Sequence, residues 1–448
     1  MSRGFWGRRR RMEDDDSLPP GQYLVEGFPV LSAGPTPRTP LEEWDFSIVG
    51  EVDEPKTWTW DEFRALPSEE ITRDIHCVTK WSKLGTRWEG VSVDTLLDGV
   101  ETAAEHMLAF CDGGYTTNLP LEDVTGGRAW IAYSYDGEPL EPEHGGPARL
   151  LVPHLYFWKS AKWVRGLRLL SHDEPGFWES LGYHNYGDPW REQRYWGTEV
   201  AGEVRSKLVW RIGEVVETRP ATPRTRSLFL DVPGWEGHRA GQHVDVRLTA
   251  EDGYQAQRSY SIASAPEEEK VELVVERLDD GEVSPYLTDE LRAGDKLELR
   301  GPIGGWFTWE AQDGGPLFLV AGGSGVAPLM AMIRHRAAAG SEAACRLLYS
   351  SRLREETIFA DELDRLAASD GSLEVIQTLT RSQPPGWTGY SRRIDARLLA
   401  EVAPSPAEVP LTFVCGPTPL VESVATALVG LGHDAGRIKT ERFGPTGG

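Results

Sequence analysis

The feature that most constrains the fold of this 448-residue chain is the segment 317–328, where an apolar run passes into closely spaced glycines. The run 317–321 is typical of a buried strand, and the residues after the glycines predict a helix towards Ala339. Apolar runs at 346–350, 373–378 and 411–415 alternate with helical patterns at 357–368 and 420–431. Buried strands that alternate with amphipathic helices build a parallel sheet between two layers of helices. Residues 306–448 are therefore predicted to form a doubly wound α/β domain.

The preceding residues, 205–305, follow a different pattern. Short runs typical of strands are separated by turns rich in Gly, Pro and Asp, and they lie at 207–217, 227–232, 243–248, 257–264, 270–277 and 295–300. Short strands at regular spacing are typical of an antiparallel barrel or sandwich. We expect an antiparallel β-barrel here.

The N-terminal half alternates short β-like runs with little helix. Strands are predicted at 46–50, 107–111, 129–135 and 149–152, and a helix at 60–66 has Thr59 or Asp61 as its N-cap. Residues 46–200 are thus predicted to be an α+β domain. Residues 1–45 combine a charged stretch at 8–16 with a Pro- and Gly-rich stretch, and they are interpreted as a flexible arm laid over a domain.

Charge and cysteine usage exclude several classes of protein. The net charge of −23 argues against nucleic-acid binding, which needs a basic face. The four cysteines show neither CxxC spacing nor the cluster of an iron–sulfur site, so no disulfide scaffold, zinc site or iron–sulfur domain is expected. No apolar run reaches about 18 residues, and acidic residues follow the N-terminal arginines. We therefore expect a cytoplasmic protein with no membrane partner.

Three motifs in the C-terminal half supply groups that suit nucleotide cofactors. Gly322, Gly323 and Gly325 let backbone N–H groups approach a diphosphate at a helix N-terminus, although glycines needed only for tight packing are the alternative. In the segment 258–261, an arginine can pair with phosphate, a tyrosine can stack on a ring and serines can hydrogen-bond. The segment 415–417 ends a predicted parallel strand, where ligands bind in such sheets.

Through these motifs, residues 207–448 resemble the ferredoxin–NADP reductase superfamily, with further matches at 281–284, 301–304 and 441–448. The resemblance implies hydride transfer from nicotinamide C4 to flavin N5. The flavin-binding residues it implies are Arg258, Ser259, Tyr260, Ser261, Val283 and Ser284, with Phe443 against the flavin ring. The nicotinamide-binding residues it implies are Gly322, Gly323, Ser324, Gly325, Cys415, Gly416 and Pro417, with Cys415 as a positioning residue and not a nucleophile.

The form of each nucleotide is predicted from two further features. Arg352, just after the strand at 347–350, and Arg381 suit a 2′-phosphate, whereas an acid would bind a ribose 2′-hydroxyl. The arginines favour NADPH; if they are solvated surface residues, NADH is the alternative. FAD is expected in preference to FMN because the resemblance is to members that lack an iron–sulfur domain.

In the N-terminal half, Cys77 is the candidate metal ligand. Positive neighbours favour the thiolate, which is the form that binds a soft metal, and a buried inert cysteine is the alternative. Four candidate cations flank it in the sequence: Arg73, His76, Lys80 and Lys83. A second basic group, suited to an anionic phosphate, consists of Arg149, Lys159 and Lys162.

Residues 20–196 resemble the sulfite oxidase family of molybdopterin-dependent oxidoreductases, through the segments 19–22, 46–50, 76–82, 88–91, 114–120 and 144–162. The resemblance implies that the Cys77 thiolate holds molybdenum, while pterin dithiolene and oxo groups complete its coordination. The candidates for binding the pterin or its phosphate are His76, Arg149, His154, Lys159, Ser160 and Lys162. Asp112 and Tyr115 are candidates for lining the open side of the metal, or else they are turn and core residues.

Together the two halves predict a flavo-molybdoenzyme that passes electrons from NAD(P)H through FAD to a molybdenum–pterin centre. Trp81 and Ser82 after the cysteine motif resemble the bacterial sulfoxide-reductase branch rather than animal sulfite oxidases. The expected substrate is therefore an S-oxide, an N-oxide or nitrate. Two alternatives stay open: oxidation of sulfite or a related thio-compound with electrons leaving through flavin, and a flavin reductase whose metal-free N-terminal domain docks a partner. The N-terminal half ends near Trp196 and the C-terminal half begins near Lys207, so there is no room for a haem domain between them.

Overall fold

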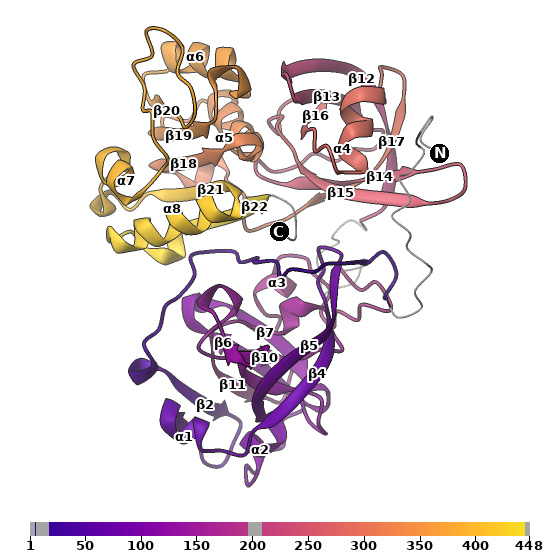
Figure 1. Ribbon diagram of the computed structural model, residues 1–448, viewed down its shortest axis with the longest axis vertical. Coiled ribbons are helices and arrows are strands. Elements are labelled where there is room, and N and C mark those ends of the chain that lie inside the picture. Colours follow the sequence, from indigo (N-terminus) through magenta and orange to yellow (C-terminus); the bar gives the residue numbers. More distant parts are fainter. Residues whose placement is uncertain (1–4, 6–17, 196–207, 444–448) are drawn as a thin grey trace. The chain divides into compact units, whose positions relative to one another are not determined.

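The computed structural model describes residues 5, 18–195 and 208–443, and the chain divides into two compact units (Figure 1). Of the described residues, 18–30 and 36–195 belong to the N-terminal unit, and 5, 31–35 and 208–443 belong to the C-terminal unit. The charged segment 8–16, the junction 196–207 and the last five residues lie outside the described residues. The predicted domain boundaries at 45, 200 and 305 stay predictions.

Two sheets build the N-terminal unit. The first has the order β3-β2-β11-β6-β7, in which only the β2–β11 pair is parallel. Its strands are β2 Asp45–Gly50, β3 Lys56–Thr59, β6 His106–Cys111, β7 Thr116–Pro120 and β11 Val164–Leu170. The second sheet contains β1 Tyr23–Leu24, β4 Glu69–His76, β5 Trp81–Ser92, β8 Trp130–Tyr135, β9 Glu138–Pro139 and β10 Arg149–Leu151. Because β1 pairs with β5, part of the predicted arm is a strand of this sheet.

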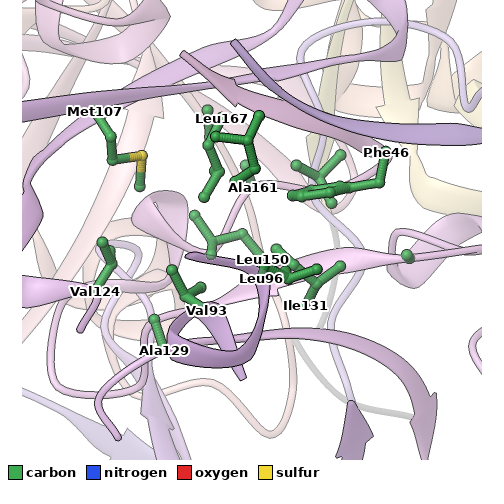
Figure 2. Close-up of a cluster of buried hydrophobic side chains, with 14 of the residues drawn as sticks. Phe46, Val93, Leu96, Met107, Val124, Ala129, Ile131, Leu150, Ala161 and Leu167 are labelled. Atoms are coloured by element: carbon green, nitrogen blue, oxygen red, sulfur yellow. The ribbon is translucent and has the colours of Figure 1, made fainter. Parts of the chain in front are cut away.

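The hydrophobic core lies where side chains of the two sheets meet (Figure 2). Phe46 and Leu167 come from the first sheet, and Ile131 and Leu150 come from the second; all four are fully buried. Alternating burial along β2 explains this packing, because successive side chains of a strand point to opposite faces. The helix α2 Val93–Leu97 closes the core with Val93 and Leu96.

The helix α1 Trp60–Arg64 forms where the sequence predicts one, and Thr59 is its cap. The Thr59 hydroxyl accepts a hydrogen bond from the N–H of Glu62, and the Glu62 carboxylate accepts one from the N–H of Thr59 at 2.8 Å. The hairpin of β4 and β5 was not predicted. Its residues alternate irregularly between buried and exposed positions, so a simple period-two signal is missing.

In the C-terminal unit, six antiparallel strands form a sheet with the order β15-β14-β17-β12-β13-β16. The strands are β12 Trp210–Thr222, β13 Thr225–Asp231, β14 His243–Thr249, β15 Gln255–Ser261, β16 Val271–Glu276 and β17 Lys296–Ile303. A bridge between Ile262 and Leu273 brings the two outer edges of the sheet together. The short helix α4 Val283–Pro285 follows β16.

The rest of this unit is a five-stranded parallel sheet with the order β20-β19-β18-β21-β22. Its strands are β18 Leu317–Gly322, β19 Cys345–Ser351, β20 Leu373–Leu379, β21 Leu411–Pro417 and β22 Ile438–Phe443. The helices α5 Val326–Ala338 and α6 Ala360–Ser369 pack on one face, and α7 Ala396–Val402 and α8 Thr418–Gly430 pack on the other. This is the doubly wound arrangement that the strand–helix alternation predicts.

The strand order reverses between β18 and β21, and ligands bind at such a reversal, beyond the carboxyl ends of the strands. The edge strand β22 was not predicted, because four polar or charged residues in a row separate Ile438 from Phe443, as in a surface segment. Among the helices of residues 18–195 and 208–443, none has the length and apolar character needed to cross a bilayer.

Candidate redox sites

Cys77 lies in the turn that joins β4 to β5. Its N–H donates to the carbonyl of Trp81 at 2.8 Å, and its own carbonyl accepts from the N–H of Lys80 at 2.9 Å. Lys80 adopts a left-handed conformation with φ of 78°. These two bonds close the turn on both sides of the cysteine and fix the backbone of Cys77. The residue is also buried, with an exposed fraction of only 7%.

A chain of buried polar groups supports this turn from the N-terminal arm. Gln22 Nε2 donates to the carbonyl of Cys77 at 3.1 Å, and the Ser82 hydroxyl donates to Gln22 Oε1 at 3.3 Å. His76 Nδ1 lies 2.8 Å from the same hydroxyl. The predicted pterin ligand His76 is thus oriented beside the cysteine by Ser82.

Arg194 supports the same turn from the other end of the domain. Its guanidinium donates to the carbonyl of Val78 and lies 4.9 Å from the centre of the Tyr156 ring. The backbone of Tyr156 in turn forms a bridge with His76. Arg194 and Gln22 were missed by the sequence analysis, because nothing local marks a residue that contacts a segment far away in the chain.

The charges around the Cys77 thiol come from distant segments. Burial raises the pKa of Cys77, while a 3.2 Å hydrogen bond from the Thr79 hydroxyl and the charges of Arg194 and Lys162 lower it. The predicted neighbours Arg73 and Lys83 instead donate to backbone carbonyls of Thr72 and Glu26.

Arg149 is a buried cation held by backbone groups. Nη1 donates to the carbonyl of His144 at 2.7 Å and Nη2 to that of Ser160 at 2.6 Å, and the guanidinium lies 4.0 Å from the centre of the Phe157 ring. The Ser160 hydroxyl accepts from the N–H of Val152 at 2.9 Å. Burial lowers the pKa of Arg149 to about 9, and Tyr115, Cys111 and Cys77 act in the opposite direction.

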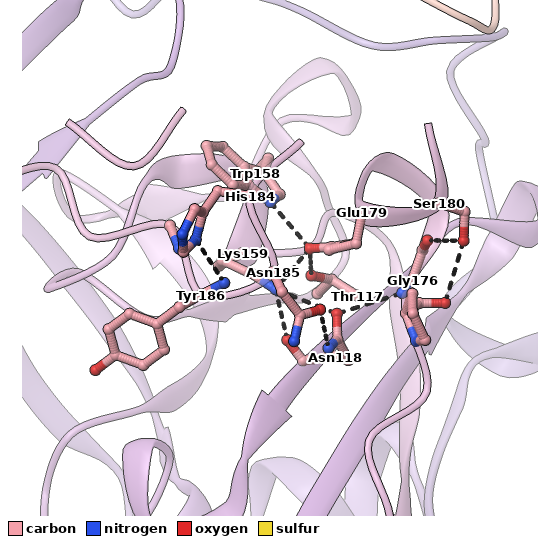
Figure 3. A network of polar contacts seen from close by, with 12 residues as sticks. Thr117, Asn118, Trp158, Lys159, Gly176, Glu179, Ser180, His184, Asn185 and Tyr186 are labelled. Atoms are coloured by element: carbon pink, nitrogen blue, oxygen red, sulfur yellow. Dashed lines mark hydrogen bonds and ion pairs between the residues drawn. The ribbon is translucent and has the colours of Figure 1, made fainter. Parts of the chain in front are cut away.

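Lys159 lies in a buried network that Figure 3 shows. Its ammonium is 2.6 Å from Glu179 Oε1 and donates to the carbonyl of Asn118 at 2.7 Å. The same carboxylate oxygen accepts from Trp158 Nε1 and from the Thr117 hydroxyl, each at 2.9 Å. Both charged side chains are completely buried. The network joins β7 to the helix α3 Phe177–Ser180, so we propose a structural role for Lys159.

The two candidates for the open side of the metal are held by other groups. The Asp112 carboxylate accepts from Arg165 Nη1 at 3.0 Å and from the Thr39 hydroxyl at 2.6 Å. The Tyr115 hydroxyl donates to the carbonyl of Trp158 at 2.6 Å. These contacts match the alternative of turn and core residues.

The remaining pterin candidates, His154 and Lys162, lie in different surroundings. His154 Nε2 is 3.4 Å from Asp123 Oδ1, and that carboxylate also pairs with Arg128 at 2.7 Å. Lys162 Nζ donates to the carbonyl of Glu143 and contributes to the field at Cys77. The structure therefore brings Lys162 and Arg149 into the electrostatic environment of Cys77, whereas His154 belongs to the Asp123 cluster.

On β15, the predicted flavin residues lie in different surroundings. The Ser259 hydroxyl donates to Asp245 Oδ1 at 2.7 Å, whereas the buried Ser261 hydroxyl lacks a hydrogen-bond partner among the described residues. Arg258 is exposed, and burial raises the pKa of Tyr260. In α4, Val283 is buried, and the Ser284 hydroxyl accepts from the N–H of Leu278 at 3.1 Å.

At the carboxyl ends of β18 and β21, two glycines allow a very close approach. A Cβ on Gly325 would lie 2.3 Å from the carbonyl oxygen of Cys415, and one on Gly416 would lie 3.1 Å from the Cα of Gly322. Packing therefore explains these glycines. By contrast, a Cβ on Gly323 would meet no atom within 4 Å, although its φ of 55° favours glycine. Its backbone thus faces open space, as a diphosphate site requires.

The groups next to this loop come from β21, β22 and β16. Cys415 pairs in register with Glu441, and Pro417 pairs with Phe443. Cys415 Sγ lies 3.8 Å from Glu441 Oε2, and burial raises the pKa of Glu441 to about 7. The Ser324 hydroxyl donates to Glu276 Oε2 at 2.9 Å. Glu441 was not predicted as a site residue, and only its place beside Cys415 in the sheet reveals it.

Arg352 and Arg381 lie beside each other where β19 and β20 end, since the N–H of Arg381 donates to the carbonyl of Arg352 at 3.0 Å. Both side chains are exposed, and no described residue hydrogen-bonds or ion-pairs with either guanidinium. Arg354, three residues from the end of β19, instead binds Asp364 at 2.5 Å.

Comparisons with known proteins place these sites in families. An oxidoreductase molybdopterin-binding domain model matches residues 33–178, an oxidoreductase FAD-binding domain model matches 214–308 and an oxidoreductase NAD-binding domain model matches 319–426. Over 194 residues, the chain is 42% identical to the oxidoreductase YuiH of Bacillus subtilis (strain 168), covering 43% of this chain and 98% of that protein. The chain is a molybdopterin-binding oxidoreductase fused to a ferredoxin reductase-type module.

The reductase module has relatives of its own. It is 34% identical over 239 residues to ferredoxin–NADP reductase B of Sorangium cellulosum (strain So ce56), which covers 51% of this chain and 96% of that protein. A solved structure of the Amycolatopsis cytochrome P450 reductase GcoB has a similar fold, with a TM-score of 0.51, 21% identity and coverage of 77% of this chain and 88% of that one. The cofactors of this molybdopterin-binding oxidoreductase are therefore molybdenum–molybdopterin, FAD and a nicotinamide dinucleotide, as predicted.

The residues of both modules fit these groups. In the molybdopterin-binding domain, the buried donors Arg149 Nε and Trp81 Nε1 lack hydrogen-bond partners among the described residues. On β15 of the reductase module, the same holds for the buried Ser261 hydroxyl and Gln257 Nε2. Buried polar groups are rarely left unsatisfied, and a pterin phosphate or a flavin ring offers the acceptors that these donors need.

Proposed function

We propose that this molybdopterin-binding oxidoreductase takes hydride from NADPH onto FAD and uses the electrons to reduce an oxo-substrate of the S-oxide, N-oxide or nitrate type. The observation that carries the proposal is the Cys77 turn, which presents one buried thiol beside buried donors that lack partners. A single cysteine fits a metal whose other ligands come from its own cofactor. The absence of a haem or iron–sulfur domain stays a prediction.

Within the molybdopterin-binding domain, we assign the metal-ligand role to Cys77 and pterin contacts to His76, Arg149 and Lys162. Bound there, molybdenum–pterin supplies two-electron oxygen-atom chemistry, which protein side chains cannot provide. Gln22 and Arg194 act as positioning residues, because they hold the backbone of the cysteine turn from outside.

Within the reductase module, the N–H groups of Gly323 and Gly325 are proposed to bind the nicotinamide diphosphate at the start of α5. Phe443 would pack against the flavin and Cys415 would position the nicotinamide, and together these two cofactors would supply hydride transfer. The exposed guanidinium groups of Arg352 and Arg381 support a 2′-phosphate, and hence NADPH.

A metal and flavin inventory tests the proposal. We expect wild-type protein to carry molybdenum and FAD, and Cys77→Ser to lose one sulfur ligand in molybdenum X-ray absorption and to lose oxo-substrate reduction, while it keeps FAD and NADPH–ferricyanide activity. Cys111→Ser is the matched control, because Cys111 is also buried in this domain but is not a proposed ligand. An unchanged number of sulfur ligands at molybdenum in Cys77→Ser would contradict the ligand assignment.

The direction of electron flow needs its own measurement. Under anaerobic rapid mixing with NADPH, we expect flavin bleaching followed by an absorbance change of the molybdenum centre, and then reoxidation by an S-oxide, an N-oxide or nitrate. If sulfite bleaches the flavin and no oxo-substrate consumes NADPH, the enzyme instead works as an oxidase.

The choice of nucleotide is tested by Arg352→Ala/Arg381→Ala. Loss of charge-assisted hydrogen bonds of about 1.5–3 kcal/mol should raise the KM for NADPH about 10- to 100-fold and leave that for NADH unchanged. Arg397→Ala, at an arginine with an 84% exposed side chain, serves as the control. Equal effects on both nucleotides would argue against a 2′-phosphate site.

A further inference from the structure

The reductase module contains a cavity of about 270 Å³ that none of the proposed cofactor residues lines. Its walls are the segment 305–313, which joins β17 to β18, and the amino-terminal parts of β21 and β22. Leu411, at the start of β21, lines the cavity, whereas Cys415 lies four residues further along the strand in the nicotinamide site. A strand rises about 3.3 Å per residue, so about 13 Å separates the two.

Two cations in this cavity bind only backbone oxygens. Lys439 Nζ donates to the carbonyl of Thr308 at 3.3 Å, and Arg437 Nε donates to that of Val409 at 3.1 Å. Neither side chain forms an ion pair with a carboxylate among the residues that the structure describes. A third cation, Arg239, is already paired with Glu310 at 2.6 Å.

The negative charges near the cavity do not balance the positive charges of these cations. Asp313 is the acid that lines the cavity, and its carboxylate accepts from the N–H of Glu310 at 2.9 Å. With Arg239 neutralised by Glu310, two cations face one acid in a chain of net charge −23. Burial lowers the pKa of Lys439; Asp313 raises it, while Arg239 and Arg437 lower it further. A bound anion would relieve this repulsion.

Trp309 and Phe413 lie next to the cavity but are fully buried, so they offer no surface to a ligand, and the accessible lining is mainly polar. The Lys439 ammonium lies 4.9 Å from the centre of the Trp306 ring and 5.2 Å from the centre of the Phe413 ring. A volume of 270 Å³ is at the small end of ligand pockets. Cations beside a mainly polar lining suit a small anion.

We propose that this cavity binds a phosphate group, which lies between Lys439 and Arg437. A dianion matches two cations better than a single carboxylate does, because it can accept charge-assisted hydrogen bonds from both. Such a ligand would join the segment 305–313 to β22. It therefore stabilises the connection between the antiparallel and the parallel sheets.

Calorimetric titration of the full-length, FAD-loaded protein with phenyl phosphate and with inorganic phosphate, in a chloride buffer, tests this. We expect both to bind with similar affinity, and Lys439→Met/Arg437→Gln to weaken binding at least tenfold. Lys270→Met, at an exposed lysine of the same unit, should bind like wild type. If neither probe binds to the wild-type protein, the proposal is wrong.

A second set of variants separates this cavity from the proposed 2′-phosphate site. Arg352→Ala/Arg381→Ala should keep the phenyl phosphate isotherm; if it abolishes the isotherm while the cavity variant retains it, the proposal is wrong. Asp313→Asn removes the competing acid and leaves both cations in place, so binding should tighten several-fold. Unchanged or weaker binding to Asp313→Asn would also overturn the proposal, even if the cavity double variant fails to fold.

Discussion

Replacing Lys159 by methionine separates a structural role from a cofactor role for this buried lysine. The ammonium is 2.6 Å from Glu179 Oε1 and 2.7 Å from the carbonyl of Asn118, and both charged side chains are fully buried. In Lys159→Met the Glu179 carboxylate keeps the donors Trp158 and Thr117, but it faces no cation. The side-chain volume is nearly conserved, so the effect should be electrostatic.

The magnitude follows from the burial of the pair. Removing one partner of a buried ion pair costs about 3–5 kcal/mol, because the other charge is left uncompensated. A typical domain is stable by about 5–15 kcal/mol, so the N-terminal unit should lose a large fraction of its stability. Adding Glu179→Gln removes the stranded charge, and the double variant should recover about 1–3 kcal/mol relative to the sum of the single variants.

Urea unfolding followed by tryptophan fluorescence measures this, because most tryptophans precede residue 200. FAD fluorescence reports the reductase module separately and should not change. Lys162→Met is the matched control: that lysine is partly exposed and donates to a backbone carbonyl, so its loss should cost less than about 1 kcal/mol. Because Lys162 is a proposed pterin contact, Lys162→Met should lower the molybdenum content instead.

The opposite pattern would refute the reasoning. A loss below about 1 kcal/mol in Lys159→Met, together with lost molybdenum, would mean that Lys159 binds the cofactor and that its pairing with Glu179 does not stabilise the fold.

Two further predictions concern the nicotinamide end of the reductase module. Burial raises the pKa of Glu441 from 4.5 to about 7, so the folded state binds this proton more tightly than the unfolded state does. The unfolding free energy should therefore fall by up to about 3 kcal/mol as pH rises from 4.5 to above 7. In urea titrations at pH 5 and pH 8, Glu441→Gln should reduce this pH dependence, and an unchanged pH dependence would mean that other groups cause it. Gly325→Ala places a Cβ 2.3 Å from the Cys415 carbonyl oxygen. In thermal unfolding this variant should lose about 1–3 kcal/mol of unfolding free energy, and its KM for NADPH should rise. The control Gly430→Ala, with open space around the added Cβ, should be neutral or slightly stabilising.

The sequence by itself determined the parts that depend on local patterns. The apolar run and glycines at 317–328 predicted β18, the loop and α5, and Thr59 or Asp61 as N-cap predicted the start of α1. Period, capping and turn chemistry are properties of neighbouring residues, so they can be read along the chain. Cys77 could be singled out in the same way, because candidate cations flank it in the sequence.

Only the tertiary structure decided which groups act on Cys77 and which merely support the fold. Gln22 and Arg194 reach the cysteine turn from 55 and 116 residues away in sequence. Lys159, a cofactor candidate from its sequence, turned out to face Glu179 in a buried network. Burial and long-range pairing depend on which segments pack together, and a charge that looks free in the sequence can be fully neutralised in the fold.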